Sequence, residues 1–196
     1  MAAAKDGCGI VVATDKGQRL HLGIPEAEFV EDIDSFMSQP GNETAESVLK
    51  KLEEQYQKYR FMDLNLALKK RRLKKQIPEI KQTLDILKYM QKKKESTNSL
   101  QTRFLLADNL YCKALIPPTD KVCLWLGANI MLEYDTDEAE ALLKNNLATA
   151  TKNLNCLEED LDFLRDQFTT TKVNMARVFN WDIQRRNEAD STESNA

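Results

Sequence analysis

Two long heptad repeats, separated by a short apolar block, constrain this chain more than any other feature. Large apolar residues recur at every seventh position between Leu52 and Leu87, and again between Leu147 and Met175. A strict seven-residue repeat keeps one narrow apolar seam against a partner helix, so both stretches are predicted to form coiled coil. The predicted seam consists of Leu52, Tyr59, Leu66, Leu73, Ile80, Leu87, Leu147, Leu154, Leu161 and Phe168.

The block between the repeats consists of short apolar runs divided by turn residues, a pattern typical of strands. We expect strands at 102–107, 110–116, 122–126 and 130–134, with hairpin turns at 108–109 and 127–129. The predicted fold class is α+β but mainly α: a long antiparallel helical coiled-coil hairpin with two β-hairpins at the bend.

This pattern divides the chain into five segments. They are an N-terminal extension at 1–43, a coiled-coil helix at 44–98, a double β-hairpin at 99–134, a second coiled-coil helix at 135–187 and a tail at 188–196. The tail and most of the extension are expected to be disordered. Within the extension, Pro25 is expected to open a short helix near 25–37. Pro78 lies inside the first long helix and either kinks it or is absorbed smoothly.

Composition excludes several classes of function. Charged residues make up 30% of the chain and aromatic residues 7%, which argues against an ordinary globular core. No stretch approaches the length of a membrane span. The four cysteines show no CxxC spacing, and His21, the only histidine, falls in a segment expected to be disordered. We therefore expect no metal, no cofactor and no disulfide, and a cytoplasmic location with the nucleus as an open second site.

No catalytic motif is present. The sequence contains no Gly-rich phosphate loop, no GxSxG and no HExxH, so an enzyme is not expected.

Charge predicts how the two helices pair. Residues 45–98 carry 15 Lys and Arg against 7 Asp and Glu, whereas residues 135–190 carry 7 against 12. Folding the chain antiparallel about Pro117 sets the basic run 69–75 against the acidic run 158–162. The same register pairs Leu66 with Phe168, Tyr59 with Met175 and Asp63 with Thr171. Exposed ion pairs are individually weak, so the seam supplies stability while charge selects orientation and register.

The basic run has two other interpretations. Clustered Lys and Arg are also the electrostatic footprint of nucleic-acid binding, although a net charge of −3 does not encourage it. The run could also be a solvated charged face.

Neither face of the predicted hairpins is polar, because apolar residues occupy alternate positions on both sides. Isolated two-stranded hairpins are marginal in water, so this block is expected to assemble with other chains. The predicted oligomerisation residues are Phe104, Leu106, Leu110, Leu115, Val122, Leu124, Trp125, Leu126, Ile130 and Leu132. The alternative is a self-contained sheet packed on the end of the helices.

The segment 109–134 resembles the double hairpin of α-class prefoldin subunits, and the resemblance covers about residues 25–190. Its most specific parts are 126–134, which reads LGANIMLEY, and Asp137-Glu138-Ala139. The resemblance implies an ATP-independent co-chaperone of two α-class and four β-class subunits. It implies that coiled-coil tips hold unfolded actin, tubulin and other nascent chains and pass them to the cytosolic chaperonin. It implies neither a membrane nor a nucleic-acid partner.

The tips implied by this resemblance lie where both repeats end, and there the apolar residues exceed what a two-helix seam hides. The predicted client-binding residues are Tyr56, Phe61, Met62, Met175, Phe179, Trp181 and Ile183. Flexible Met and large aromatic side chains suit weak binding of varied apolar segments. Alternatively, Phe179 and Trp181 pack against Phe29, Ile33 and Phe36 and close the tip.

A structural tether is the main competing function. Its long helices would pair with helices of other proteins, and it would have no use for four strands that are apolar on both faces.

Overall fold

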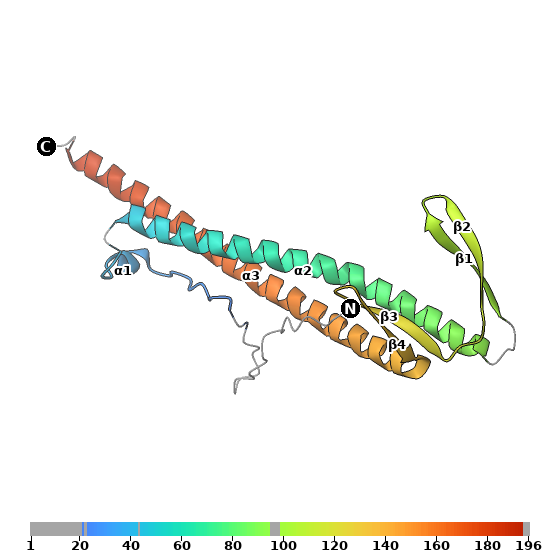
Figure 1. Ribbon diagram of the computed structural model, residues 1–196. Coiled ribbons are helices and arrows are strands. Elements are labelled where there is room, and N and C mark those ends of the chain that lie inside the picture. Colours follow the sequence, from blue (N-terminus) through green and yellow to red (C-terminus); the bar gives the residue numbers. More distant parts are fainter. Residues whose placement is uncertain (1–20, 22, 43, 95–98, 194–196) are drawn as a thin grey trace, which may run out of the picture. The chain divides into compact units, whose positions relative to one another are not determined.

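The computed structural model describes residues 21, 23–42, 44–94 and 99–193 (Figure 1). Its elements in chain order are α1 (Ile33–Met37), α2 (Ala45–Lys94), β1 (Leu100–Ala107), β2 (Leu110–Ile116), β3 (Lys121–Gly127), β4 (Ile130–Asp135) and α3 (Thr136–Glu193). Two long helices flank two β-hairpins, which confirms the predicted fold class.

The chain divides into two compact units, and each contains part of both long helices. One unit, called here the hairpin unit, contains residues 71–155. The other, called here the strap unit, contains the described residues up to Lys70 and those from Cys156 onward. Within each unit α2 and α3 lie side by side (Figure 1).

The core of the hairpin unit combines the helix seam with one face of a hairpin. Its buried residues are Ile80, Leu84, Leu87, Ala139 and Leu143. Val122, Leu124 and Tyr134 of the second hairpin pack against them. Because β3 and β4 supply this third layer, the two helices are covered where their own side chains would otherwise face water.

Both hairpins are antiparallel two-stranded sheets, β1 with β2 and β3 with β4, at the positions the sequence predicts. Each carries a register irregularity beside its turn, between Leu105 and Ala107 and between Trp125 and Gly127. Ala128 and Asn129 form the second turn with φ of 48° and 58°. Positive φ at both central residues is the geometry that matches the twist of a two-residue hairpin, and Ala128 adopts it at a steric cost.

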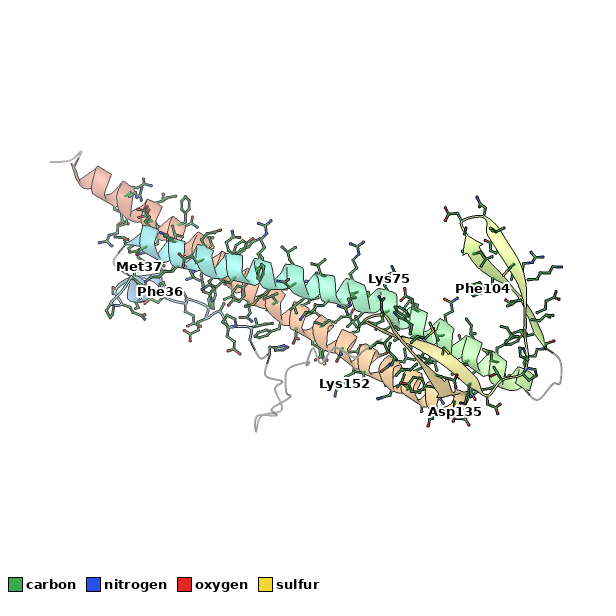
Figure 2. All side chains as sticks on the ribbon, viewed as in Figure 1. Phe36, Met37, Lys75, Phe104, Asp135 and Lys152 are labelled. Atoms are coloured by element: carbon green, nitrogen blue, oxygen red, sulfur yellow. The ribbon has the colours of Figure 1, made fainter. Side chains whose placement is uncertain are left out.

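The core of the strap unit contains three segments of chain. Met37, Ala45, Val48 and Val178 are buried together, and Ile33, Phe36, Leu49, Leu52 and Trp181 pack around them. Figure 2 labels Phe36 and Met37 on α1. Further along the seam Tyr59 and Leu164 are fully buried. None of the ten predicted seam residues is exposed.

The helix register differs from the predicted one by 6 positions at the Lys70–Glu158 ion pair and by 10 at the Tyr56–Phe168 contact, on average close to one heptad. In the strap unit the Tyr56 ring packs edge-on against Phe168 at 4.6 Å, whereas the predicted partner of Phe168 was Leu66. Lys70 Nζ lies 3.0 Å from Glu158 Oε1, so the basic and acidic runs do face each other. The error has a physical cause: a shift by one heptad restores the same apolar pattern, and charge runs several residues long tolerate it.

Two predicted boundaries differ from the structure. Pro25 opens no helix, because residues 24–30 are extended and α1 begins at Ile33, after the N-cap Asp32. The second long helix does not end near 187 but continues to Glu193, and the sequence there contains no Gly or Pro to stop it. His21, the only histidine, was expected in a disordered segment, but it contacts Asp160. The expected disorder of residues 1–20 lies outside the described residues.

Pro78 does not interrupt α2, which runs as one helix from Ala45 to Lys94. The division into five segments otherwise remains a prediction.

Candidate protein-binding surfaces

The two hairpins expose more large apolar side chains than any other part of the described chain. On the first hairpin these are Phe104, Leu105, Leu106, Leu110, Tyr111 and Leu115, and on the second Trp125, Ile130, Met131 and Leu132. Figure 2 labels Phe104 on the first hairpin. Contiguous exposed apolar surface of this kind marks a protein-binding surface.

The predicted oligomerisation residues fall into two groups. Val122 and Leu124 are half-buried and pack against the helix core of the same chain. Leu126 is also half-buried, whereas Phe104, Leu106, Leu110, Leu115, Trp125, Ile130 and Leu132 are exposed. The hairpin unit thus covers part of one face of β3–β4 by itself, because Leu132, the cross-strand partner of Leu124, stays exposed there. The opposite face, with Trp125 and Met131, is exposed. The role of the exposed set in oligomerisation remains a prediction.

A second surface is a shallow apolar groove in the strap unit, near the start of α2 and the end of α3. It encloses about 520 Å³ between Leu49, Lys50 and Glu53 of α2 and Met175, Ala176 and Phe179 of α3. Phe179 forms one wall and is 54% exposed. A flexible thioether beside an exposed ring suits an apolar segment of varied shape.

The seven predicted client-binding residues do not share one environment. Phe61, Phe179 and Ile183 are exposed, at 69%, 54% and 41%. Met62 and Met175 are half-buried, and Met175 lines the groove. Tyr56 packs on Phe168, and Trp181 packs into the core with α1.

The alternative of a closed tip, in which the short N-terminal helix covers Phe179 and Trp181, therefore applies to Trp181 and not to Phe179. The Trp181 indole packs against the same buried cluster as Ile33 and Phe36 of α1, and its Nε1 donates to Asp34 Oδ1 at 2.6 Å. Phe179, two positions earlier on α3, remains exposed. The short helix covers one aromatic side chain and leaves the groove open.

An extended segment before α1, residues 23–32 and called here the strap, lies along α3. The backbone N–H of Ala27 donates to Gln167 Oε1 at 2.7 Å. Asn174 pairs with the strap twice, accepting from the Val30 N–H at 3.1 Å and donating to the Glu28 carbonyl at 2.7 Å. The strap thus satisfies polar groups that a two-helix seam would leave unpaired.

The ends of the strap are also held. The His21 ring stacks on Phe163 with centroids 4.2 Å apart, and its Nδ1 lies 2.7 Å from Asp160 Oδ1. The Tyr59 hydroxyl donates to the Pro25 carbonyl at 2.7 Å, and burial raises the pKa of this phenol, which keeps it a donor. Arg177 Nη2 donates to the Glu31 carbonyl at 2.8 Å.

The sequence prediction missed these strap contacts. Gln167 and Asn174 are 8% and 2% exposed, and Thr171 is fully buried between them. Asp160, Gln167, Asn174 and Trp181 follow one another at heptad spacing on α3. Buried amides at heptad spacing beside an apolar seam were the available signal, because such groups need hydrogen-bond partners that an opposing coiled-coil helix does not provide.

Within the residues that the structure describes, no three His, Cys, Asp or Glu side chains are grouped as metal ligands would be. Nor does any helix in this described part combine the length and apolarity required to cross a membrane.

Comparison with known proteins places the chain in a family. Residues 59–181 match the family model "Prefoldin subunit". The chain belongs to the prefoldin family. It is 80% identical over 196 residues to "Prefoldin subunit 3" of Mus musculus, with the whole of both chains covered. It is 52% identical to "Prefoldin subunit 3" of Drosophila melanogaster, over 90% of each chain.

Among solved structures, the fold is similar to that of a chain in the cryo-EM structure of filamentous PFD from Methanocaldococcus jannaschii. The TM-score is 0.50 at 19% identity, covering 60% of this chain and 95% of the other. At this identity the likeness shows the prefoldin fold alone. Family membership makes this protein a prefoldin-type chaperone subunit whose partners are other prefoldin subunits.

Proposed function

We propose that this protein is an α-class arm of a prefoldin hexamer that captures unfolded actin, tubulin and other nascent chains and delivers them to the cytosolic chaperonin without ATP. The proposed setting is the cytoplasm. The exposed faces of the two hairpins would join two α-class and four β-class subunits into one assembly. The groove of the strap unit would hold the client.

The observation that carries the client role is the open groove beside Phe179. An exposed phenylalanine next to Met175 offers apolar contact area without a fixed shape, so that many sequences can bind weakly. Weak contacts suffice when several arms hold one chain, because each additional contact benefits from a high effective concentration. The same weakness permits release to a second chaperone.

The hairpin surface supports the assembly role. Both faces of β1–β2 carry exposed apolar side chains, for example Leu105 and Tyr111 on one cross-strand pair and Leu110 beside the turn. Coverage by sister subunits would remove this area from water.

Phe179→Ser tests the client role in the reconstituted complex. The matched control is Ile86→Ser in the hairpin unit, since Ile86 and Phe179 are both 54% exposed. We expect Phe179→Ser to lose several-fold in suppression of the aggregation of denatured actin, and Ile86→Ser to leave suppression unchanged. Equal suppression by the wild-type and Phe179→Ser complexes would reject the groove as the client site.

A further inference from the structure

The hydrogen bonds that hold the strap on α2 and α3 are made by its main chain. Its carbonyl groups at Pro25, Glu28 and Glu31 and its N–H groups at Ala27 and Val30 make the hydrogen bonds described above. Main-chain groups are present in every polypeptide. The side chains that receive them therefore recognise an extended backbone and not a particular sequence.

The strap's own side chains make fewer contacts than its main chain. Pro25, Glu26, Glu28, Phe29 and Glu31 are exposed, although the Phe29 ring lies 5.1 Å from the Arg177 guanidinium. Ile24, Ala27 and Val30 are half-buried. By contrast, the apolar anchors lie outside the strap, in α1, where Ile33, Phe36 and Met37 join the core.

The receiving side chains, called here the backbone track, are Tyr59 of α2 and Gln167, Asn174 and Arg177 of α3. Asn174 pairs with an N–H and a carbonyl of the strap as a neighbouring β-strand would. With the strap docked, Tyr59, Gln167 and Asn174 are buried and their polar groups are directed to its main chain.

We propose that the backbone track is a binding site for an extended segment of a non-native polypeptide, and that the strap is its intramolecular occupant. This inference rests on the proposed client function and adds a second site beside the groove. A client segment replaces the strap by offering the same alternating N–H and carbonyl groups. Native proteins have their backbone groups already paired, so the track selects for unfolded chains.

Intramolecular occupancy sets a threshold for binding. The strap is tethered at α1, so a client must compete with a high local concentration of it. An external segment can bind only when the strap has left the track. Its apparent affinity is therefore the intrinsic affinity multiplied by the fraction of molecules in which the track is free. Only a chain held simultaneously at other sites, such as the groove, displaces the strap efficiently.

The test uses the reconstituted complex with full-length chain or with chain lacking residues 1–31, which retains the Asp32 cap and α1. The probe is a fluorescein-labelled peptide of residues 21–31, followed by fluorescence anisotropy. We expect the deleted form to bind it on the order of tenfold more tightly than the full-length form. Equal binding by the two forms would overturn the proposal.

Modified peptides test main-chain recognition without altering the protein. N-methylation of Ala27 and Val30 removes the two donors and should weaken binding on the order of tenfold, since each lost hydrogen bond contributes modestly. A peptide methylated at Phe29 is the matched control and should retain binding. Unchanged binding of the Ala27 and Val30 peptide would reject the track.

A pair of protein variants extends the test to clients. Deletion of residues 1–31 should increase capture of denatured actin, and Asn174→Ala in the deleted form should abolish that increase. If capture of denatured actin increases whether or not Asn174 is present, the increase is due to newly exposed apolar surface, and client binding on the track is rejected.

The results also separate this inference from the proposed function. If the peptide binds but no variant captures denatured protein, the proposed client function fails and the track stands as a peptide site. Native mass spectrometry confirms that each variant enters the hexamer.

Discussion

The hairpin unit and the strap unit build the same two-helix seam but complete it with different third elements. In the hairpin unit, β3 and β4 add apolar side chains, and Val122 and Leu124 pack onto Ile80 and its neighbours. In the strap unit, the strap adds main-chain groups that pair with Gln167 and Asn174. One interface is stabilised by burial and the other by hydrogen bonds, so they should respond to different perturbations.

The largest expected effect comes from truncating the apolar core of the hairpin unit. Leu84 is 5% exposed, so Leu84→Ala should lower the free energy of unfolding by about 2–5 kcal/mol, through lost transfer energy and the cavity left behind. Urea denaturation followed by circular dichroism measures it. Leu68→Ala is the control, because Leu68 is 63% exposed and its truncation should change stability by less than about 0.5 kcal/mol.

Replacing a polar side chain of the strap unit should have an intermediate effect. Asn174→Leu leaves the Val30 N–H and the Glu28 carbonyl without their partner, at a cost of about 1–3 kcal/mol if the strap stays docked. We therefore expect the strap to detach, with faster hydrogen exchange at Ala27 and Val30. Exchange in β3 should not change. Slow exchange of both strap amides in Asn174→Leu would show that hydrogen bonding does not hold the strap.

Acid should weaken α1 before the hairpin core. The pKa of the Asp32 carboxyl is held below its ordinary 3.8, chiefly by the Ser35 hydroxyl and then by the Ser35 N–H. A lowered folded-state pKa stabilises α1 above about pH 4, and this contribution disappears as the pH falls through the lowered pKa. Trp181 fluorescence in a Trp125→Phe background reports docking of α1, because the Trp181 indole bonds to Asp34.

Asp32→Asn is the control for this pH prediction, since it retains an N-cap without titrating. Its Trp181 signal should depend less on pH than that of the parent. Identical pH profiles would show that Asp32 does not couple acid to α1.

The smallest expected effect concerns the second hairpin turn. Ala128→Gly relieves a left-handed backbone at φ 48° but adds freedom to the unfolded chain, so we expect a net gain of at most about 1 kcal/mol. Thermal unfolding measures it. Ala148→Gly, at an exposed helical position, should instead destabilise by about 1 kcal/mol.

The hairpin unit was largely predictable from its sequence. Turn residues at 108–109 and 127–129 separate short apolar runs, and such runs between turn residues are typical of hairpin strands. The strap unit was less predictable. Residues 25–37 have a helical apolar spacing, but only Ile33–Met37 form a helix. In the residues before it, Gln167, Asn174 and Arg177 bind the backbone outside a helix.

Of the predicted client-binding residues, exposure separates Phe61, Phe179 and Ile183 from Trp181, which α1 covers. Sequence alone could not make this separation, because it requires knowing which face of α3 the short helix occupies.

The sequence alone determined that two long helices form and pair in antiparallel orientation, and that two hairpins separate them, because heptad spacing, opposite charge and turn chemistry are local properties of the chain. The tertiary structure decided the helix register and the path of the strap. A heptad repeat matches itself after a shift of seven residues, so the sequence does not fix the register. Every non-proline residue carries the same backbone N–H and C=O groups, so the sequence of the strap does not show that its backbone is bound.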